Sequence, residues 1–181
     1  KEQEIPSGHN PDDYIVERIE YKSHDGRLVP LTITRHKKTK INGSANLLLY
    51  GYGSYGHSMS PNFSSTKLSL IERDIIWATA HIRGGMEKGM KWWKEGKLTN
   101  KKNTFEDYIH AAKYLIEKKY SSKGKIIGMG GSAGGLLMGA VVNQSPKLFL
   151  GIIMAVPFVD SLTTNLDHSL PLTVGEFDEF G

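Results

Sequence analysis

The residue with the clearest chemical potential is Ser132, which stands at the centre of a G-x-S-x-G motif. An apolar run, Ile126 to Met129, leads into this motif, and a helix-forming stretch follows it. A strand that turns sharply into a helix at such a serine presents the hydroxyl as an exposed nucleophile. Glycines suit that turn, because the strand and the helix approach closely and the backbone is strained. We therefore expect Ser132 to act as a nucleophile.

Other glycine-rich loops match this segment less well. A Walker phosphate loop requires Gly-Lys-Ser/Thr, and the Rossmann fingerprint requires a different glycine spacing with an acidic residue about 20 positions later. The sequence around Ser132 has neither pattern. An incidental serine in a glycine-rich turn is the remaining alternative.

A nucleophilic serine needs a base to accept its proton and a carboxylate to orient that base. In α/β-hydrolases both partners follow the serine in sequence. His168 is the one histidine after Ser132, and its candidate acids are Asp160 and Asp167. Asp167 is the immediate neighbour of His168 and cannot easily orient the same ring. We expect His168 to be a surface residue, and the acid and base to lie beyond Gly181.

Acyl transfer also requires hydrogen-bond donors that face the developing oxyanion. The backbone N–H of Ala133, the residue after the nucleophile, is the first expected donor. The second is expected from a loop after an early strand, where residues 50–56 read YGYGSYG. The glycines of this loop allow its backbone to approach the substrate closely, and its tyrosine hydroxyls can donate hydrogen bonds. A loop that only packs over a cleft is the alternative.

The hydrophobic pattern predicts the elements that position these residues. Continuous apolar runs are typical of strands buried on both faces, and apolar residues at helical spacing indicate amphipathic helices. Asp25-Gly26 predicts a hairpin turn, and Asn103 with Glu106 predicts a helix N-cap. We expect strands at 14–21, 28–35, 45–50, 75–82, 126–129 and 150–156, and helices at 66–73, 104–119 and 133–143.

This alternation of strands and helices predicts an α/β fold. The sheet should be mostly parallel, with helices on both faces and an antiparallel N-terminal hairpin. That is the order of elements in the α/β-hydrolase fold. No strand is expected after Val156, so we expect the sheet to be incomplete at its C-terminal side. Residues 1–13 have the composition of a linker, and residues 14–181 are expected to form the N-terminal part of the catalytic domain.

Composition narrows the classes of function. The chain has no cysteine, 39% apolar and 23% charged residues, and a net charge of +4. Its lysines are scattered without interleaved aromatic residues, which disfavours nucleic-acid binding. No apolar run approaches the roughly 20 residues that span a bilayer, no metal-ligand spacing occurs, and no cofactor is expected. The absence of cysteine suits a reducing compartment, so we expect a cytoplasmic protein.

Several motifs in order resemble the catalytic domain of the prolyl oligopeptidase family. They extend over nearly the whole chain, which makes the resemblance far more specific than G-x-S-x-G alone. The motifs are YGYGSYG at 50–56, HIRGG at 81–85, KNTF at 102–105, GGSAGG at 130–135 and VPFVD at 156–160. PLT at 171–173 and GEF at 175–177 are nearer to the oligopeptidase B branch of that family.

The resemblance implies a serine peptidase of short peptides, with a β-propeller that covers an α/β-hydrolase domain. It implies Ser132 as nucleophile, and the Tyr52 phenol and the Ala133 backbone as oxyanion donors. It also implies that Glu176 and Asp178 bind the substrate residue before the scissile bond. Residues 160–181 contain five acidic residues and no lysine or arginine, and carboxylates in a cleft favour arginine or lysine.

We therefore expect a serine endopeptidase that cleaves short basic peptides after Arg or Lys through an acyl-enzyme on Ser132. Because its acid and base are expected beyond Gly181, this catalytic-domain fragment should be nearly inactive alone. One alternative is a non-catalytic remnant or binding surface that associates with itself through an exposed sheet edge. A general esterase or acyl-peptide hydrolase is a further alternative.

Overall fold

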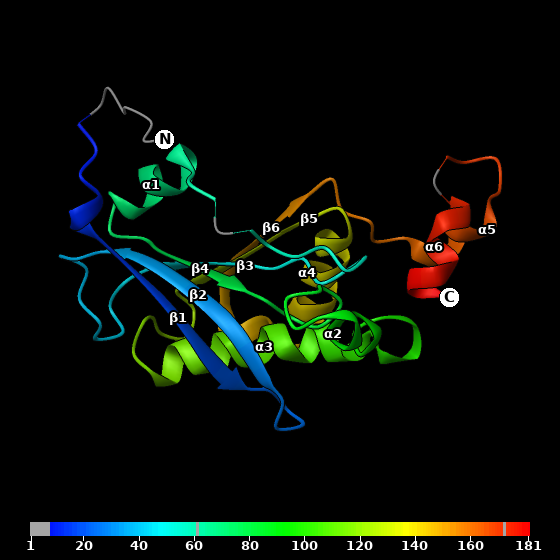
Figure 1. Ribbon diagram of the computed structural model, residues 1–181, viewed down its shortest axis with the longest axis horizontal. Coiled ribbons are helices and arrows are strands. Elements are labelled where there is room, and N and C mark those ends of the chain that lie inside the picture. Colours follow the sequence, from blue (N-terminus) through cyan, green and yellow to red (C-terminus); the bar gives the residue numbers. More distant parts are fainter. Residues whose placement is uncertain (1–7, 61, 172) are drawn as a thin grey trace.

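The computed structural model describes residues 8–60, 62–171 and 173–181. Within these residues, a six-stranded sheet in the order β1-β2-β4-β3-β5-β6 lies at the centre of the molecule (Figure 1). The strands are β1 (Tyr14–Lys22), β2 (Leu28–His36), β3 (Leu47–Tyr50), β4 (Ile76–Ala80), β5 (Ile126–Gly131) and β6 (Phe149–Ala155). The helices are α1 (Ser65–Ile71), α2 (Met90–Lys94), α3 (Lys102–Glu117), α4 (Ala133–Gln144), α5 (Ser161–Leu166) and α6 (Thr173–Phe180).

The strand pairing confirms the α/β fold class. β1 and β2 form an antiparallel hairpin, and β2 pairs antiparallel with β4. From there the sheet is parallel, because β3 lies between β4 and β5, and β5 pairs with β6. The parallel strands therefore end at one edge of the sheet. The segment after β5 contains Ser132, and the loop after β3 contains Tyr52, so both start from this edge.

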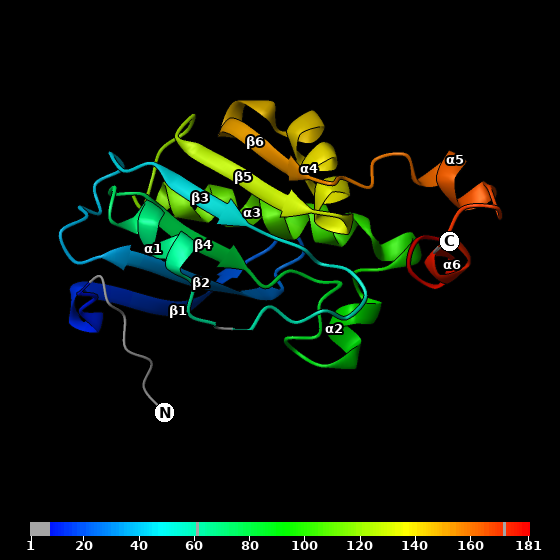
Figure 2. The same ribbon diagram turned by 90° about the horizontal axis from the view of Figure 1, so that it is seen from above.

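Helices cover both faces of the sheet. α1 packs on one face, against β4 and β2, whereas α4 packs against β5 and β6 and contacts α3 on the other (Figures 1 and 2). α5 and α6 follow β6 and stand beside the end of the sheet (Figure 2). In the described residues, no helix is both long enough and apolar enough to cross a membrane.

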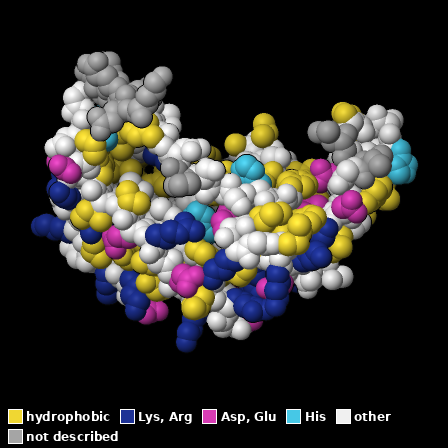
Figure 3. Space-filling view, in the orientation of Figure 1, with side chains coloured by type: hydrophobic (Ala, Val, Ile, Leu, Met, Phe, Trp, Pro, Cys, Tyr) yellow, Lys and Arg dark blue, Asp and Glu magenta, His cyan; other side chains and the backbone are white. Residues whose placement is uncertain are grey.

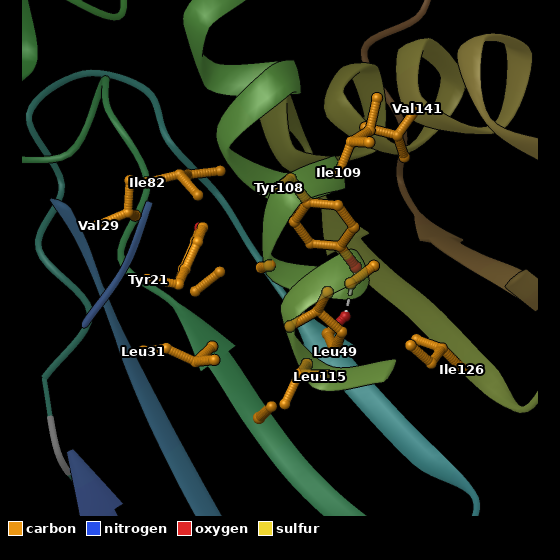
Figure 4. Packing of buried hydrophobic residues seen from close by; sticks show 14 of the residues in the cluster. Tyr21, Val29, Leu31, Leu49, Ile82, Tyr108, Ile109, Leu115, Ile126 and Val141 are labelled. Carbon is orange, nitrogen blue, oxygen red and sulfur yellow. Dashed lines mark hydrogen bonds between the residues drawn. The ribbon is translucent and has the colours of Figure 1, made fainter. Parts of the chain in front are cut away.

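The core lies between the sheet and α3. Leu31, Leu49, Tyr108 and Leu115 are fully buried there (Figure 4). The Tyr108 hydroxyl donates a hydrogen bond of 2.5 Å to the Leu49 carbonyl, so this large ring is buried with its polar atom paired. Burial of each such side chain contributes about 1.5–3 kcal/mol to folding. The core thus holds β3, whose following loop carries Tyr52, against α3.

The helices differ from the prediction in two respects. α3 begins at Lys102, so Lys101, which makes no side-chain capping bond, occupies the N-cap position expected for Asn103. The prediction did not include α2, and it did not include the short helices α5 and α6 that follow β6. Of the predicted linker, residues 1–7 lie outside the described residues.

A buried ion pair fixes the loop 81–85 against α3. Arg83, 1% exposed, donates to both carboxylate oxygens of Asp107 at 2.6 and 2.8 Å. Its guanidinium also contacts Asp25 at 2.6 Å. A Cβ at Gly84 would lie 1.9 Å from the Gly53 carbonyl oxygen, so only glycine allows the two loops to touch. The ion pair therefore supports the loop that carries Tyr52.

Candidate active site

Ser132 lies between β5 and α4 in a strained turn. Its backbone has φ 55° and ψ −120°, a left-handed conformation that is costly for a residue with a side chain. The side chain is exposed. A Cβ at Gly130 would lie 2.2 Å from the Gly134 carbonyl oxygen, and one at Gly135 would lie 2.5 Å from Pro157 Cα. These glycines therefore permit the strand, the helix and the segment after β6 to meet at the serine.

Backbone hydrogen bonds hold this turn in place. The Ser132 N–H donates to the Ala155 carbonyl at 2.9 Å. The Ser132 carbonyl accepts from Phe158 N–H at 3.0 Å and from Gly135 N–H at 2.8 Å. Ala133 is the first residue of α4, where backbone N–H groups have no acceptor within the helix and the helix dipole is positive. Its N–H can therefore donate to an anion formed beside Ser132.

Tyr52 brings its phenol to the serine from the loop after β3. Burial raises the pKa of Tyr52 above its ordinary value, and the nearby Ser132 side chain acts in the opposite direction. The negative charges of Glu176 and Glu179 also raise this pKa. The phenol is therefore protonated at neutral pH and can donate. Gly51 N–H donates to the Met129 carbonyl at 3.1 Å, which joins the loop to the end of β5.

An acidic helix borders the same region. α6 carries Glu176, which accepts a hydrogen bond of 2.7 Å from the Tyr55 hydroxyl, and Asp178, which is exposed. The Phe180 ring lies 6.0 Å from Tyr55 and 5.6 Å from Phe158 between ring centroids. These contacts place α6 beside both the tyrosine loop and the segment after β6, whose Phe158 N–H donates to the Ser132 carbonyl. Figure 3 shows acidic side chains at the right of the molecule, where α5 and α6 lie, beside a hollow in the upper face.

Two charged residues of this region were not identified as candidate site residues from the sequence. Lys101 and Glu179 are buried, at 8% and 2% exposure, and lie 3.4 Å apart. The Trp93 indole N–H donates to the other Glu179 oxygen at 2.8 Å. Glu179 stands three residues after Glu176, a helical spacing that could have placed both on one face. No local signal identified Lys101 among the many lysines of the chain.

The histidines of the described residues do not complete a triad with an evident geometry. His168 is exposed, as expected of a surface residue, and its ring packs near Phe177 with 6.2 Å between centroids. His57 is also exposed and lies edge-on to the Tyr52 ring at 5.5 Å. No role is predicted for His57 from the sequence. The arrangement around Ser132 thus has the geometry that a nucleophile with two oxyanion donors requires.

A cavity of about 490 Å³ lies elsewhere, on the face of the sheet that α1 covers. Tyr14, Thr32, Phe63 and Trp77 are among its mostly apolar lining residues. Neither Ser132, Tyr52 nor Glu176 contributes to this lining. This cavity is therefore separate from the candidate chemistry, which occupies an open edge of the sheet.

The amino-acid sequence of this chain is similar to those of known peptidases. The sequence profile of the prolyl oligopeptidase family matches residues 61–181. Dipeptidyl aminopeptidase BI of Pseudoxanthomonas mexicana is 48% identical over 182 residues, which cover 100% of this chain and 25% of that protein. Protease 2 of Moraxella lacunata is 49% identical over 165 residues, covering 91% of this chain and 24% of the relative.

Solved structures agree with the sequence relatives. Oligopeptidase B from Leishmania major has a TM-score of 0.96 and 44% identity, covering 100% of this chain and 25% of its own. Oligopeptidase B from Trypanosoma brucei, in a closed form with covalently bound antipain, has a TM-score of 0.96 and 40% identity, with coverage of 100% and 26%. The chain spans about a quarter of the length of these relatives.

Proposed function

Because this chain belongs to the prolyl oligopeptidase family of serine peptidases, we propose that it supplies the nucleophile and oxyanion site of a serine endopeptidase that cleaves short peptides after Arg or Lys. The observation that carries the proposal is the exposed Ser132 hydroxyl, held in a strained turn at the start of α4, with Tyr52 packed against the first turn of the same helix, 3.3 Å from the position of a Cβ on Gly134. Both groups are placed by backbone geometry before any substrate binds. Such preorganisation is the main source of oxyanion stabilisation.

In the proposed reaction, the Ser132 oxygen attacks the carbonyl carbon of the scissile peptide bond while a histidine base takes the serine proton. The resulting oxyanion accepts hydrogen bonds from the Tyr52 hydroxyl and the Ala133 N–H. The tetrahedral intermediate then expels the amine, which receives the proton from the histidine, and leaves an acyl-enzyme on Ser132. Water hydrolyses that ester with the same base. The donors act most strongly once the oxygen is negatively charged, so they raise kcat.

The proposed preference for basic side chains rests on α6. Glu176 is half-buried and is held by the Tyr55 hydroxyl at 2.7 Å, and Asp178 is exposed nearby on the same helix. A guanidinium can form paired hydrogen bonds with carboxylates, and an ammonium can bind as a point charge. Short basic peptides are therefore the proposed substrates. We place the reaction in the cytoplasm, because a chain without cysteine suits a reducing compartment.

The test is hydrolysis of an arginyl chromogenic amide by the full-length protein that contains this chain, compared with prolyl and uncharged amides. We expect the arginyl amide to be preferred, and Ser132→Ala to lower kcat by a factor of roughly 10⁴ or more. Glu176→Gln should raise KM for the arginyl amide while leaving uncharged esters nearly unaffected. Equal turnover by the Ser132→Ala variant would refute the proposal. A faster reaction with esters than with any peptide would favour a general esterase or acyl-peptide hydrolase.

The isolated 181-residue chain should hydrolyse the arginyl amide very slowly. His168 is exposed and packs against Phe177, so we propose that it does not serve as the base. Without a base, what remains is the contribution of the oxyanion donors, on the order of 10³-fold over water. Turnover by this chain comparable with that of the full-length protein, abolished by His168→Ala, would overturn this part of the proposal.

A second candidate specificity comes from the similarity to dipeptidyl aminopeptidase BI, at 48% identity over the whole chain. An aminopeptidase of that type would require a free amino group two residues before the scissile bond. Matched arginyl dipeptide amides, with and without a blocked N-terminus, distinguish the two activities. Endopeptidase activity predicts turnover of the blocked substrate, whereas dipeptidyl aminopeptidase activity predicts turnover of the free one alone.

We also propose that the isolated chain associates with itself through β6. Among the described strands β6 pairs only with β5, and it exposes Leu150, Ile153 and Met154 at 43–60%. An unpaired strand with exposed apolar residues is prone to edge-to-edge pairing. Size-exclusion chromatography of the isolated chain should show dimers or larger species, and replacing Ile153 by Lys should shift it toward monomer. A clean monomer at micromolar concentration would contradict this.

A further inference from the structure

The buried ammonium of Lys101 contacts three acceptors from two separate segments. It donates to the Gly53 carbonyl at 2.7 Å and to the Ser54 hydroxyl at 2.5 Å, both in the loop that carries Tyr52. It also donates to Glu179 on α6 at 3.4 Å. The residue itself is 8% exposed. An ammonium has three N–H donors, so all three are used, and none is directed at solvent.

Glu179 is held from a second side, which makes the junction rigid. Its other carboxylate oxygen accepts the Trp93 indole N–H at 2.8 Å, and the residue is 2% exposed. The Lys101 ammonium also lies 5.2 Å from the centre of the Phe180 ring, within cation–π range. α6 is therefore fastened at its last turn. Glu176, one turn earlier, is fastened by the Tyr55 hydroxyl.

The two segments joined by Lys101 have different tasks in the proposed peptidase. Gly53 directly follows Tyr52, the proposed oxyanion donor, and Glu179 is three residues after Glu176, the proposed ligand of the basic substrate side chain. A displacement of either segment by about 1 Å can lower the rate by a factor of about 100, since catalysis depends on near-attack geometry. The group that fixes their separation thus influences both substrate binding and oxyanion stabilisation.

We propose that Lys101 is a positioning residue that locks the Tyr52 loop to α6, so that the oxyanion donor and the acidic substrate site keep one fixed separation. This inference rests on the proposed function, because it assigns Lys101 a role in that reaction. Lys101 does not touch the reacting atoms. It acts through the Gly53 carbonyl on one side and through the Glu179 carboxylate on the other.

The protonation state of Lys101 provides an independent test of this connection between the Tyr52 loop and α6, which we call the lock. Burial lowers the pKa of Lys101 to about 8, while Glu179 acts in the opposite direction. Glu179 is the charged group in contact with the ammonium. Glu176 lies one turn away on α6, and Lys97 faces the Trp93 ring at 3.9 Å. Above this pKa the amine is neutral and loses one donor, so kcat/KM for arginyl amides should fall as the pH rises through about 8.

The experiment compares Lys101→Met with Lys102→Met in the full-length protein. Lys102 is the adjacent lysine and is exposed, so its variant controls for the loss of a positive charge. We expect Lys101→Met to lower kcat/KM for an arginyl amide roughly tenfold to a hundredfold, the size expected for losing a buried charge-assisted hydrogen bond. Both a higher KM and a lower kcat should contribute. Lys102→Met should stay within about twofold, as usual for surface changes.

Two further variants keep the proposal testable if Lys101→Met folds poorly. Glu179→Gln keeps the size of the side chain but removes the ion pair. It should lower kcat for an uncharged ester, although the described hydrogen bonds of Glu179 are with Lys101 and Trp93 and not with the Tyr52 loop. Lys101→Arg stays charged at all accessible pH values, so it should abolish the fall in kcat/KM near pH 8. In a double-mutant cycle, the Lys101→Met and Glu179→Gln effects should be strongly non-additive.

The outcomes separate this proposal from the proposed function. If Ser132→Ala abolishes hydrolysis but Lys101→Met behaves like Lys102→Met, the lock is refuted and the peptidase proposal stands. If the Lys101→Met and Glu179→Gln effects are additive, or the Lys101→Arg enzyme keeps the same alkaline fall, the lock is likewise refuted. If Ser132→Ala retains full activity, the proposed function itself fails.

Discussion

Replacing Tyr52 by Phe removes one hydroxyl group from the candidate site and leaves the aromatic ring. The Tyr52 ring is half-buried and lies 6.2 Å from the Tyr55 ring and 5.5 Å from His57. Phenylalanine can keep these contacts. The lost interactions are the electrostatic contact of the hydroxyl with the nearby Ser132 side chain and, in the proposed reaction, the hydrogen bond donated to the oxyanion.

The expected magnitude follows from the number of donors that remain. Loss of one oxyanion donor costs about 2.7–4 kcal/mol, or roughly 10²–10³ in kcat. The Ala133 N–H lies at the start of α4 and is unaffected, so we expect a decrease of about 10² in kcat. KM should change little, because the substrate carbonyl is a weaker acceptor than the oxyanion. Burial raises the pKa of Tyr52, so the defect should be constant from neutral pH to about pH 9.

Tyr55→Phe is the matched control, since it removes a hydroxyl from the same loop. The Tyr55 hydroxyl donates to Glu176, so its loss should alter KM for arginyl substrates and leave kcat for an uncharged ester nearly unchanged. Steady-state kinetics of the full-length protein with an arginyl amide and an uncharged ester separate the two effects. The assignment of Tyr52 is refuted if its variant keeps kcat within about threefold, or if both variants change only KM.

Three further predictions concern the scaffold and the substrate site. Gly130→Ala should destabilise the fold by about 2 kcal/mol or more through overpacking, because its Cβ would lie 2.2 Å from the Gly134 carbonyl oxygen. Thermal unfolding measures this change. Gly151→Ala on β6 is the control and should be neutral, because no described atom lies within 4 Å of its Cβ. Asp107→Asn should cost about 3 kcal/mol by weakening the buried pair with Arg83, lowering Tm by roughly 10 °C; a change no larger than that of an exposed carboxylate variant would contradict the assigned role of this pair. Glu176→Gln combined with Tyr55→Phe should raise KM for arginyl amides no more than Glu176→Gln alone, and additive effects would show that the Tyr55 contact does not position Glu176.

The secondary structure could be predicted where local pattern and local geometry agree. Apolar runs identified the strands, and an Asp-Gly step identified the hairpin between β1 and β2. G-x-S-x-G identified the turn at Ser132, because the requirement for glycine there depends on neighbours in the chain and on nearby backbone. The predictions were weakest at the helix N-cap of α3 and at the three helices that were missed, α2, α5 and α6. These helices are short, so their stability depends on packing rather than on propensity.

The sequence by itself therefore determined the family of serine peptidases, the candidate residues for its chemistry, and the order in which most of the strands and helices occur. Only the tertiary structure decided the strand order β1-β2-β4-β3-β5-β6, the approach of Tyr52 to Ser132, and the contact between Lys101 and Glu179, which are 78 residues apart. The physical reason is that a strained turn is encoded by adjacent residues. The partner of a buried charge, in contrast, depends on which distant segments the packed core brings together, and no local sequence pattern indicates which segments these are.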